Sequence, residues 1–363
     1  MKTFPLAILL LCALSAAAPA QTGPAIIWSS QQSSALTNRA AVAFSPDGQL
    51  VATGRADSND VQLRTAESGK LLRVLTGQNN NANVIAFSPD GQYLATGTGQ
   101  PGQNLSLNLW RVSDGVRLVG RIPAFTNGTT SVNFSPDSQL LVASGFHTTG
   151  YNIYHVPDMT LLATIANFDP EIGINIRVNA VAFSPDGQLI AIGDTRALRL
   201  RRASDGALIR TMNTDAPGPM STLAVAFSPD GQYVAAGVSV TDFQYARCID
   251  CAVKMFRVSD GALVQTFENG NNMTFPRIAF TGGGRTVAAA YAHDHDNAGA
   301  VQFWNVATGQ TQQLDVHDLW PWDFALAPAG DAYAFFRGDG LAGVAIARQP
   351  PAFMGPPETS KGR

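Results

Sequence analysis

The sequence is poor in cysteine and in charge. Its 363 residues include three cysteines, and Asp, Glu, Lys and Arg together make up 14% of the chain. Three cysteines are too few for a disulfide scaffold. An apolar core must therefore stabilise the fold. There are 24 Lys and Arg against 27 Asp and Glu, a formal net charge of -3. Because no excess of cations is present to neutralise phosphates, nucleic acid is not an expected partner.

Long apolar runs are absent after the first twenty residues, so no membrane insertion is expected. Residues 1–20 combine Lys2, an apolar run from Leu6 to Leu14 and the ending Ala18-Pro19-Ala20. This pattern is typical of a signal peptide, here cleaved before Gln21. A membrane anchor is the alternative, but the run is shorter than the ~18 to 20 residues that span a bilayer. We therefore expect a secreted or periplasmic mature chain from a bacterium.

A seven-residue phrase recurs along the chain and defines a repeat. AFSPDGQ or NFSPDSQ occurs with its aromatic residue at Phe44, Phe87, Phe134, Phe183 and Phe227. Weaker copies, AFTGGGR and ALAPAGD, follow at Phe280 and Leu326. The copies are 43 to 53 residues apart. This period indicates a repeat architecture of seven units.

Each unit has the pattern of four antiparallel strands. An apolar run such as ANVIAF, residues 82–87, enters Ser-Pro-Asp-Gly, which is typical of a type I turn, and a second apolar run follows. After a variable loop, an alternating segment such as LSLNLWRV, residues 105–112, leads into a second turn, SDG, and a last strand. The sequence therefore predicts an all-β fold, a seven-bladed β-propeller of four-stranded antiparallel blades.

The repeat resembles that of the WD-repeat family of β-propellers, from about Ile26 to Ala347. The resemblance rests on the Phe-Ser-Pro-Asp-Gly turn, the Leu-Ala-Thr-Gly second strand, and an aromatic residue before the second turn at Trp110, Tyr154, Phe256 and Trp304. Arg64 and Arg201 replace that aromatic in two units, and the family's Trp-Asp pair and Gly-His are missing. The resemblance thus implies a degenerate bacterial type, in which we expect the family's hydrogen-bonded Asp-His-Ser-Trp network to be absent.

The two ends of the sequence predict how the ring closes. The last copy supplies only three strands, around residues 324–326, 332–336 and 343–347. The segment AIIW, residues 25–28, precedes Phe44 by about the distance at which LLRVL precedes Phe87. We expect this N-terminal strand to complete the last blade, with a propeller over residues 21–348 and a disordered Pro-rich tail over 349–363.

The connections between strands divide into two sets. Both regular turns, Ser-Pro-Asp-Gly and Ser-Asp-Gly, are expected on one face of the ring, which we call the regular face. Long and dissimilar loops, such as ANFDPEIGINIRVN and VSVTDFQYARCIDC, are expected on the opposite, irregular face. Binding residues concentrate on such loops. The predicted function is therefore a non-catalytic, monomeric scaffold that binds a protein partner or another ligand through its irregular face.

Two loops of the irregular face carry the candidate binding residues. AHDHDNAG, residues 292–299, contains His293, Asp294, His295 and Asp296, and VHDLWPWDF, residues 316–324, contains His317, Asp318, Trp320, Trp322 and Asp323. His293 and His295 could chelate a metal ion from an extended segment, but further ligands would be needed. A solvated polar loop is the alternative interpretation. Capping of the channel is the alternative for the two tryptophans.

The mature chain keeps one cysteine pair, Cys248 and Cys251, spaced C-x-x-C. In an oxidising compartment this pair is expected to form a small loop disulfide, with reduced thiols or a metal site shared with His293 and His295 as alternatives.

An enzyme is the rival class of function. A divalent-metal-dependent hydrolase or lactonase would gather His317, Asp318 and Asp323 with Asp169 and Glu171 across the mouth of the channel. The sequence contains no nucleophile elbow, phosphate loop or zincin motif. No catalytic residue and no cofactor are therefore predicted.

Overall fold

A computed structural model describes the strands and the regular turns of the chain. The described residues are 26–31, 41–54, 59–78, 82–98, 107–122, 125, 128–145, 148–169, 171–212, 221–242, 247–268, 274–292, 299–316, 324–330, 332–337 and 343–348. Within these ranges, the one helical element is the 3-10 turn η1 (Gly282–Gly284). No helix in the described part of the chain is long and apolar enough to cross a membrane.

Six sheets each contain four strands that are consecutive in the chain. Blade 1 contains β2 (Val42–Phe44), β3 (Leu50–Gly54), β4 (Val61–Thr65) and β5 (Leu71–Leu75). Blade 2 contains β6 (Ala82–Phe87), β7 (Tyr93–Thr98), β8 (Leu107–Arg111) and β9 (Arg117–Ile122). Blade 3 contains β10 (Thr129–Phe134), β11 (Leu140–Gly145), β12 (Gly150–His155) and β13 (Leu161–Ala166).

The second half of the chain repeats this arrangement. Blade 4 contains β16 (Val178–Phe183), β17 (Leu189–Asp194), β18 (Leu198–Arg202) and β19 (Leu208–Met212). Blade 5 contains β20 (Ser221–Phe227), β21 (Tyr233–Asp242), β22 (Arg247–Arg257) and β23 (Leu263–Glu268). Blade 6 contains β24 (Thr274–Thr281), β25 (Thr286–Ala292), β26 (Gly299–Asn305) and β27 (Thr311–Val316). A small hairpin of β14 (Phe168–Asp169) and β15 (Ile174–Asn175) lies between blades 3 and 4.

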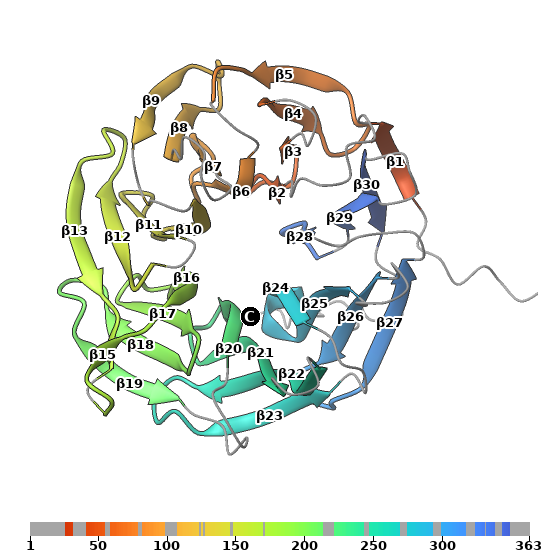
Figure 1. Cartoon of the computed structure of the whole chain (residues 1–363). Helices are drawn as coiled ribbons and strands as arrows, with labels where there is room; N and C mark the ends of the chain where they lie inside the picture. Colours follow the sequence, from red (N-terminus) through yellow and green to blue (C-terminus); the bar gives the residue numbers. More distant parts are fainter. Residues whose placement is uncertain are drawn as a thin grey trace, which may run out of the picture.

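A further four-stranded sheet, the closing blade, joins the two ends of the chain. Its strand order is β1-β30-β29-β28, with β1 (Ile26–Gln31), β28 (Phe324–Leu326), β29 (Ala332–Arg337) and β30 (Gly343–Arg348). The N-terminal β1 pairs antiparallel with β30 as the outer strand, so the predicted closure is confirmed. Counted with this sheet, the described residues contain seven four-stranded sheets, and Figure 1 shows them as a ring whose innermost strands are β2, β6, β10, β16, β20, β24 and β28.

The apolar core is distributed between adjacent blades. Each hydrophobic cluster of the described residues combines side chains from two neighbouring sheets. Between blades 5 and 6, for example, the buried rings of Phe267 and Trp304 lie with their centroids 5.6 Å apart. The closing blade shares one cluster with blade 6 and another with blade 1. No blade buries its apolar face alone, so the ring must close to complete the core.

The Ser-Pro-Asp-Gly turns are held by a hydrogen-bond pattern that repeats from blade to blade. In blade 4 the hydroxyl of Ser184 donates to Asp186 Oδ1 at 2.5 Å and accepts from the backbone N–H of Leu189 at 2.9 Å. Asp186 also accepts from the N–H of Gln188. Equivalent bonds form at Ser45, Ser88, Ser135 and Ser228. The Ser184 hydroxyl and the Gln188 N–H hold the pKa of Asp186 below its usual value.

Neighbouring turns contact each other around the regular face. The proline of one turn lies against the glycine of the next, in the pairs Pro46 with Gly91, Pro136 with Gly187, Pro185 with Gly231, Pro229 with Gly284 and Pro328 with Gly48. Blade 3 has Ser138 at the glycine position, with a φ of 61°. Its hydroxyl accepts a hydrogen bond at 3.1 Å from the N–H of Asp90 in blade 2. This bond compensates for a left-handed conformation that disfavours serine.

Two arginines clamp the second turns to neighbouring blades. Arg73 on β5 donates to the carbonyl oxygens of Ser113 and Asp114 in blade 2, at 2.9 and 2.6 Å. Arg210 on β19 makes the same pair of bonds to the second turn of blade 5. Contacts between blades therefore determine the geometry of both turn types on the regular face.

Two predicted loops contain ordered β-structure instead. The segment VSVTDFQYARCIDC was expected to be a loop, but β21 continues to Asp242 and β22 begins at Arg247. The ladder includes the pair of Ser239 with Cys251, because the β-branched residues of this segment continue the strand pattern. Similarly, the predicted loop before blade 4 contains the β14–β15 hairpin.

We predict that Ser184→Ala lowers the free energy of unfolding by about 1 kcal/mol at neutral pH, because the buried hydroxyl loses two hydrogen bonds. Ser204→Ala, in the exposed second turn of the same blade, is the matched control and should have almost no effect. Because the pKa of Asp186 is lower in the folded state than its usual value of 3.8, this carboxylate stabilises the fold at pH values above 3.8. That contribution is lost as the pH falls through the folded-state pKa of Asp186. The difference between wild type and Ser184→Ala should therefore narrow below about pH 4 in urea titrations.

Candidate functional site

The nine candidate binding residues lie outside the part of the chain that the structure describes. His293, Asp294, His295 and Asp296 lie between β25 and β26 of blade 6, and His317, Asp318, Trp320, Trp322 and Asp323 lie between β27 and the closing blade. Both segments therefore connect strands at the positions expected for irregular-face loops. Their role as binding residues stays a prediction.

The cysteine pair lies in a strand and not in a loop. Cys248 and Cys251 both belong to β22, opposite Thr241 and Ser239 of β21. Cys251 is disulfide-bonded, while the side chain of Cys248 is outside the described set. The pairing of these two cysteines stays a prediction.

The irregular face is best described at blade 4. Because neighbouring strands are antiparallel, the turns after the first and third strands lie at one end of each blade, and the other connections lie at the opposite end. Most of these other connections lie outside the described residues. The β14–β15 hairpin and the turn at residues 194–197, between β17 and β18, are both described except for residue 170. The site can therefore be built here.

A row of buried polar side chains runs through the third strand of each of blades 1 to 6. Each lies two residues before the aromatic or arginine position of the repeat: Gln62, Asn108, Asn152, Arg199, Lys254 and Gln302. Sequence analysis missed this row, although the alternation in VQLR, LNLW, YNIY, LRLR, VKMF and VQFW contains it. A polar residue that recurs between two buried apolar positions is a signal for internal hydrogen bonding.

Blade 2 contains a neutral hydrogen-bond network built from residues other than the family's Asp-His-Ser-Trp set. The indole N–H of Trp110 donates to Thr96 Oγ1 at 3.0 Å, and the Thr96 hydroxyl donates to Gln78 Oε1 at 3.0 Å. All three side chains are buried. Gly77-Gln78 stands before the first strand of blade 2, at the position where the WD-repeat family has Gly-His. The Asp-His-Ser-Trp network was expected to be absent, and in this blade glutamine and threonine supply the groups that bind the tryptophan instead.

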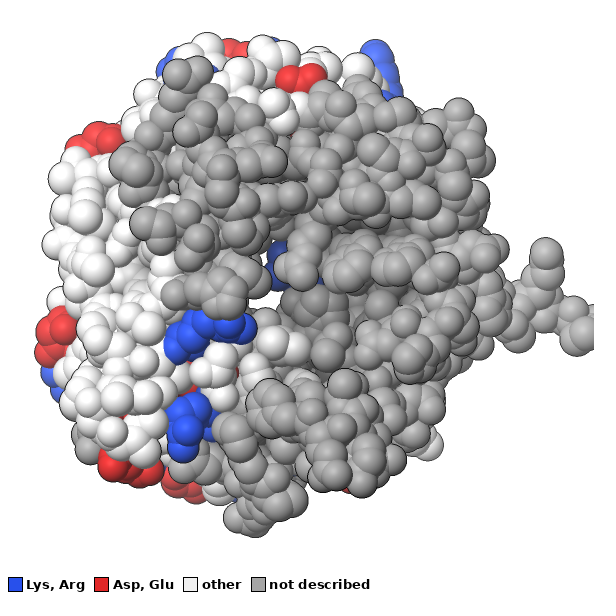
Figure 2. Space-filling view, viewed as in Figure 1, with Lys and Arg blue, Asp and Glu red and all other residues white. Residues whose placement is uncertain are grey.

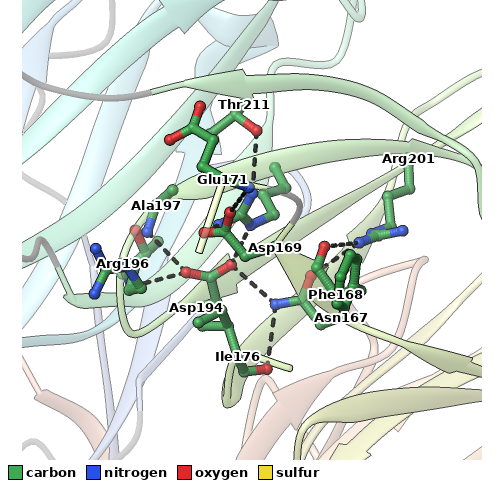
Figure 3. Close-up of polar contacts among 12 residues, drawn as sticks. Asn167, Phe168, Asp169, Glu171, Ile176, Asp194, Arg196, Ala197, Arg201 and Thr211 are labelled. Atoms are coloured by element: carbon green, nitrogen blue, oxygen red, sulfur yellow. Dashed lines mark hydrogen bonds and ion pairs between the residues drawn. The ribbon is translucent and has the colours of Figure 1, made fainter. Parts of the chain in front are cut away.

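Blade 4 has a charged network, shown in Figure 3, in which Arg201 stands at the position that Trp110 has in blade 2. Arg199 donates from Nε to Asp194 Oδ2 and from Nη2 to Asp169 Oδ2, both at 2.7 Å. Asn167 donates to the same oxygen of Asp194 at 2.9 Å and accepts from Arg201 Nη2 at 3.2 Å. These five side chains are all buried, and two carboxylates balance two guanidinium groups.

The network fixes the backbone of both connections on the irregular face. Asp194 Oδ1 accepts from the N–H groups of Arg196 and Ala197 at 2.8 and 2.7 Å, which shapes the turn after β17. Asp169 Oδ1 accepts from the N–H of Glu171 at 2.9 Å, and Arg201 donates to the carbonyl of Phe168 at 3.3 Å. One set of buried charges therefore positions the hairpin and the neighbouring turn together.

Burial and charge pairing act against each other on the pKa values in this network. Burial alone would raise the pKa of Asp169, but the Glu171 N–H and the Arg199 guanidinium outweigh it and lower the pKa. Burial would lower the pKa of Arg199, but Asp194 and Asp169 outweigh it and raise the pKa. Each oxygen of both carboxylates already accepts a hydrogen bond. The arrangement therefore positions backbone and does not present a free base.

The rival metal site would have needed Asp169 at the channel mouth. Asp169 points instead into blade 4 and pairs with Arg199, because a buried carboxylate requires a cation. Glu171 lies exposed in the turn of the hairpin. Within the described residues, no group of three or more His, Cys, Asp or Glu side chains could hold a metal ion.

A ring of four-stranded antiparallel blades defines the protein as a β-propeller. Residues 37–61, 69–111 and 174–200 match the family described as WD domain, G-beta repeat. The β-propeller domain of Cps50 (Swd1) from Myceliophteria thermophila is similar, with a TM-score of 0.70 and 17% identity over 85% of this chain and 96% of that chain. A chain of the mitotic checkpoint complex has a TM-score of 0.70 and 16% identity over 96% of this chain and 99% of that chain. No curated protein sequence matches.

Three segments of the chain match the WD-repeat family model and the fold is that of a β-propeller, so both findings agree with the resemblance stated from the sequence. Its bacterial type stays a prediction.

We predict that Arg199→Met lowers the free energy of unfolding by about 3 to 5 kcal/mol, because it leaves two buried carboxylates without their shared cation. Arg202→Ala is the matched control: it breaks an ion pair with Asp205 whose side chains are 52% and 50% exposed, and it should cost less than about 1 kcal/mol. Urea unfolding of both variants measures the difference.

The loss of unfolding free energy in Arg199→Met should depend on pH, and this dependence separates a charge effect from a packing effect. In Arg199→Met the folded-state pKa of Asp169 should rise above its unfolded value, so protonation favours the fold. The deficit against wild type should then shrink as the pH falls from about 7 to about 5. A deficit that does not change over this range would show that Arg199 acts through packing alone.

Proposed function

We propose that the protein is an extracytoplasmic, non-catalytic scaffold that binds a protein partner or another ligand through its irregular face. The observation that carries this proposal is the difference between the two faces. On the regular face, five of the first turns contact the next turn through Pro–Gly pairs and two of the second turns are held by arginine clamps, so little backbone at these turns is free to vary. The irregular face carries elements outside the repeat, namely the β14–β15 hairpin and the long β21–β22 hairpin.

The comparisons support a scaffold over an enzyme. One similar structure is a chain of the mitotic checkpoint complex, and a propeller that works within a protein assembly is an interaction module. Large rigid rings suit this role because they present loops from several blades at fixed distances. We further propose that the chain is a monomer of bacterial origin, and that the loops containing His293 and Trp320 contribute to the binding surface.

The metal content of the purified mature protein tests this proposal against the hydrolase. We expect less than one bound ion per chain and no change in melting temperature on adding Ca2+, Zn2+ or EDTA. A stoichiometric ion that is lost in both His293→Ala and Asp323→Ala would overturn the scaffold proposal. Asp205→Ala, on the regular face, is the control for a general effect of removing a carboxylate.

The proposed location has its own test. If residues 1–20 are a signal peptide, the protein expressed in a bacterium should be exported and its N-terminal residue should be Gln21. Edman sequencing or intact mass of the exported protein measures this. Retention in the cytoplasm with Met1 in place would contradict the location without affecting the scaffold proposal.

A further inference from the structure

The outer strand of blade 3, β13, presents a row of exposed, mostly apolar side chains. Its alternate residues Leu162, Thr164 and Ala166 are exposed, and so is Phe168, which begins β14. The exposed fractions of Leu162 and Phe168 are 55% and 47%. The Thr164 hydroxyl donates to Asn152 Oδ1 at 2.9 Å, so its polar group is directed into the blade. Because alternate residues of a strand lie on one side, these four side chains form a single row, which we call the edge stripe.

The edge stripe carries no charge. Residues 159–168 contain no Asp, Glu, Lys or Arg. The outer strands of five other blades do contain charged residues, namely Arg73 in β5, Arg117 and Arg121 in β9, Arg210 in β19, Glu268 in β23 and Asp315 in β27. The outer strand β1 has no charge either, but it ends in Ser-Ser-Gln. On the left of the ring in Figure 2, the surface along the course that β13 takes in Figure 1 is mostly white, the colour of uncharged residues.

The backbone of β13 has an open outer edge. Within the described residues, β13 is the last strand of its sheet. The N–H of Asn167 donates towards β12, to the carbonyl of Thr149 at 2.8 Å. Because the pattern alternates, the N–H of Ile165 also points to β12, and those of Thr164 and Ala166 point away from it. Proteins often protect such an edge with charged side chains or proline, and β13 has neither. An extended segment of another chain can therefore pair with this edge.

The edge stripe continues into the β14–β15 hairpin. β13 ends at Ala166 and β14 begins at Phe168, and Ile172 and Ile174 of the hairpin are 41% and 55% exposed. Contiguous exposed apolar groups are typical of interaction surfaces. Arg201 of the buried network donates to the carbonyl of Phe168 at 3.3 Å and fixes this end of the stripe. A surface that is ordered before binding loses less conformational entropy when a partner docks.

A second copy of the chain does not match this edge along its length. In a closed symmetric dimer, two β13 strands would pair antiparallel. Phe168 of one copy would then lie beside the start of β13 in the other copy. That end adjoins the exposed turn in which His155 Nδ1 and Asp158 Oδ1 are 2.9 Å apart. The apolar end of each stripe would meet a polar turn, whereas a separate apolar segment has no such mismatch.

We propose that the outer edge of β13 binds an extended segment of a partner protein, with uncharged apolar residues at alternate positions, as a fifth strand of blade 3. The backbone of the segment pairs with the outward N–H and C=O groups of β13, and its apolar side chains cover Leu162, Ala166 and Phe168. Main-chain hydrogen bonds supply affinity, and the edge stripe selects apolar side chains because a charge buried against it would be unfavourable. This inference rests on the proposed scaffold function and names the partner's chemistry.

Three pools of eight-residue peptides with blocked termini test the inference on the full mature chain. In the first pool, Val, Ile or Phe alternate with Ser or Thr. In the second pool, Lys or Glu replaces Val, Ile and Phe, and the third pool repeats the first with methylated backbone nitrogens, which cannot donate hydrogen bonds. Fluorescence anisotropy should show binding of the first pool and at least about tenfold weaker binding of the second and third.

Two variants test the edge from the side of the protein. Leu162→Lys places a charge on the edge stripe and Thr164→Pro removes an outward N–H, and each should weaken binding of the first pool by about tenfold or more. Val264→Lys and Thr266→Pro make the same changes at the equivalent positions of β23 and are the matched controls, which should leave binding unchanged. Leu162→Lys should melt like wild type because this side chain is half exposed, so it decides the question even if Thr164→Pro does not fold.

Several outcomes would overturn the inference. Equal binding of all three pools, no binding of the first pool, or unchanged binding by Leu162→Lys would each do so. A dimer in sedimentation velocity that Leu162→Lys dissociates would also do so, because the occupant would then be a second copy of the chain. If the first pool binds but only variants elsewhere on the irregular face weaken it, the scaffold proposal stands and the edge inference fails.

Discussion

The structure depends on the burial of apolar side chains between neighbouring blades. Every hydrophobic cluster of the described residues spans two sheets, so each blade is stabilised by the blades on either side and the ring must be complete to bury all of them. The closing blade meets this requirement by combining β1 with β28, β29 and β30. Loss of β1 would leave the outer edge of β30 without its strand partner, which is why the N-terminal segment is part of the fold and not an extension of it.

This constraint acts differently on the two faces. On the regular face, the turn glycines lie against prolines of the preceding blade, and the turn carbonyls accept hydrogen bonds from Arg73 and Arg210. A longer turn would break contacts with two blades. The connections on the other face carry no such repeated contacts among the described residues, so insertions such as the β14–β15 hairpin are compatible with the ring.

Blade 4 illustrates how one repeat can be adapted. Blade 2 uses Trp110, Thr96 and Gln78 as a neutral network, whereas in blade 4 Arg201 stands at the position of Trp110 and joins a charged network that includes Asn167 and Asp194. Buried ion pairs add little net stability, because desolvation offsets their attraction, but they demand specific partners. Arg199 needs both Asp194 and Asp169, and Asp169 belongs to the inserted hairpin. The charged network thereby ties a surface element to the core.

Much of the fold follows from local patterns. The Ser-Pro-Asp-Gly turns, the alternation of the strands and the shortage of one strand in the last unit are properties of neighbouring residues, and they correctly predicted the blades and the closure by β1. The buried row that includes Asn108 and Arg199 was also visible as an alternation, but its meaning depended on knowing that both faces of these strands are covered. The segment around Cys248, residues 247–252, has the residues of a strand, yet only the ladder with β21 shows that it is one.

The sequence by itself therefore determined the repeat, the turn chemistry and the order of strands, because these depend on short-range preferences of the backbone. Tertiary structure alone decided which side chains meet across blades. Asp169 precedes Asp194 and Arg199 by 25 and 30 residues, and no local pattern shows that the three converge. Their pairing arises from the packing of the hairpin against blade 4, where a carboxylate removed from water must find a cation.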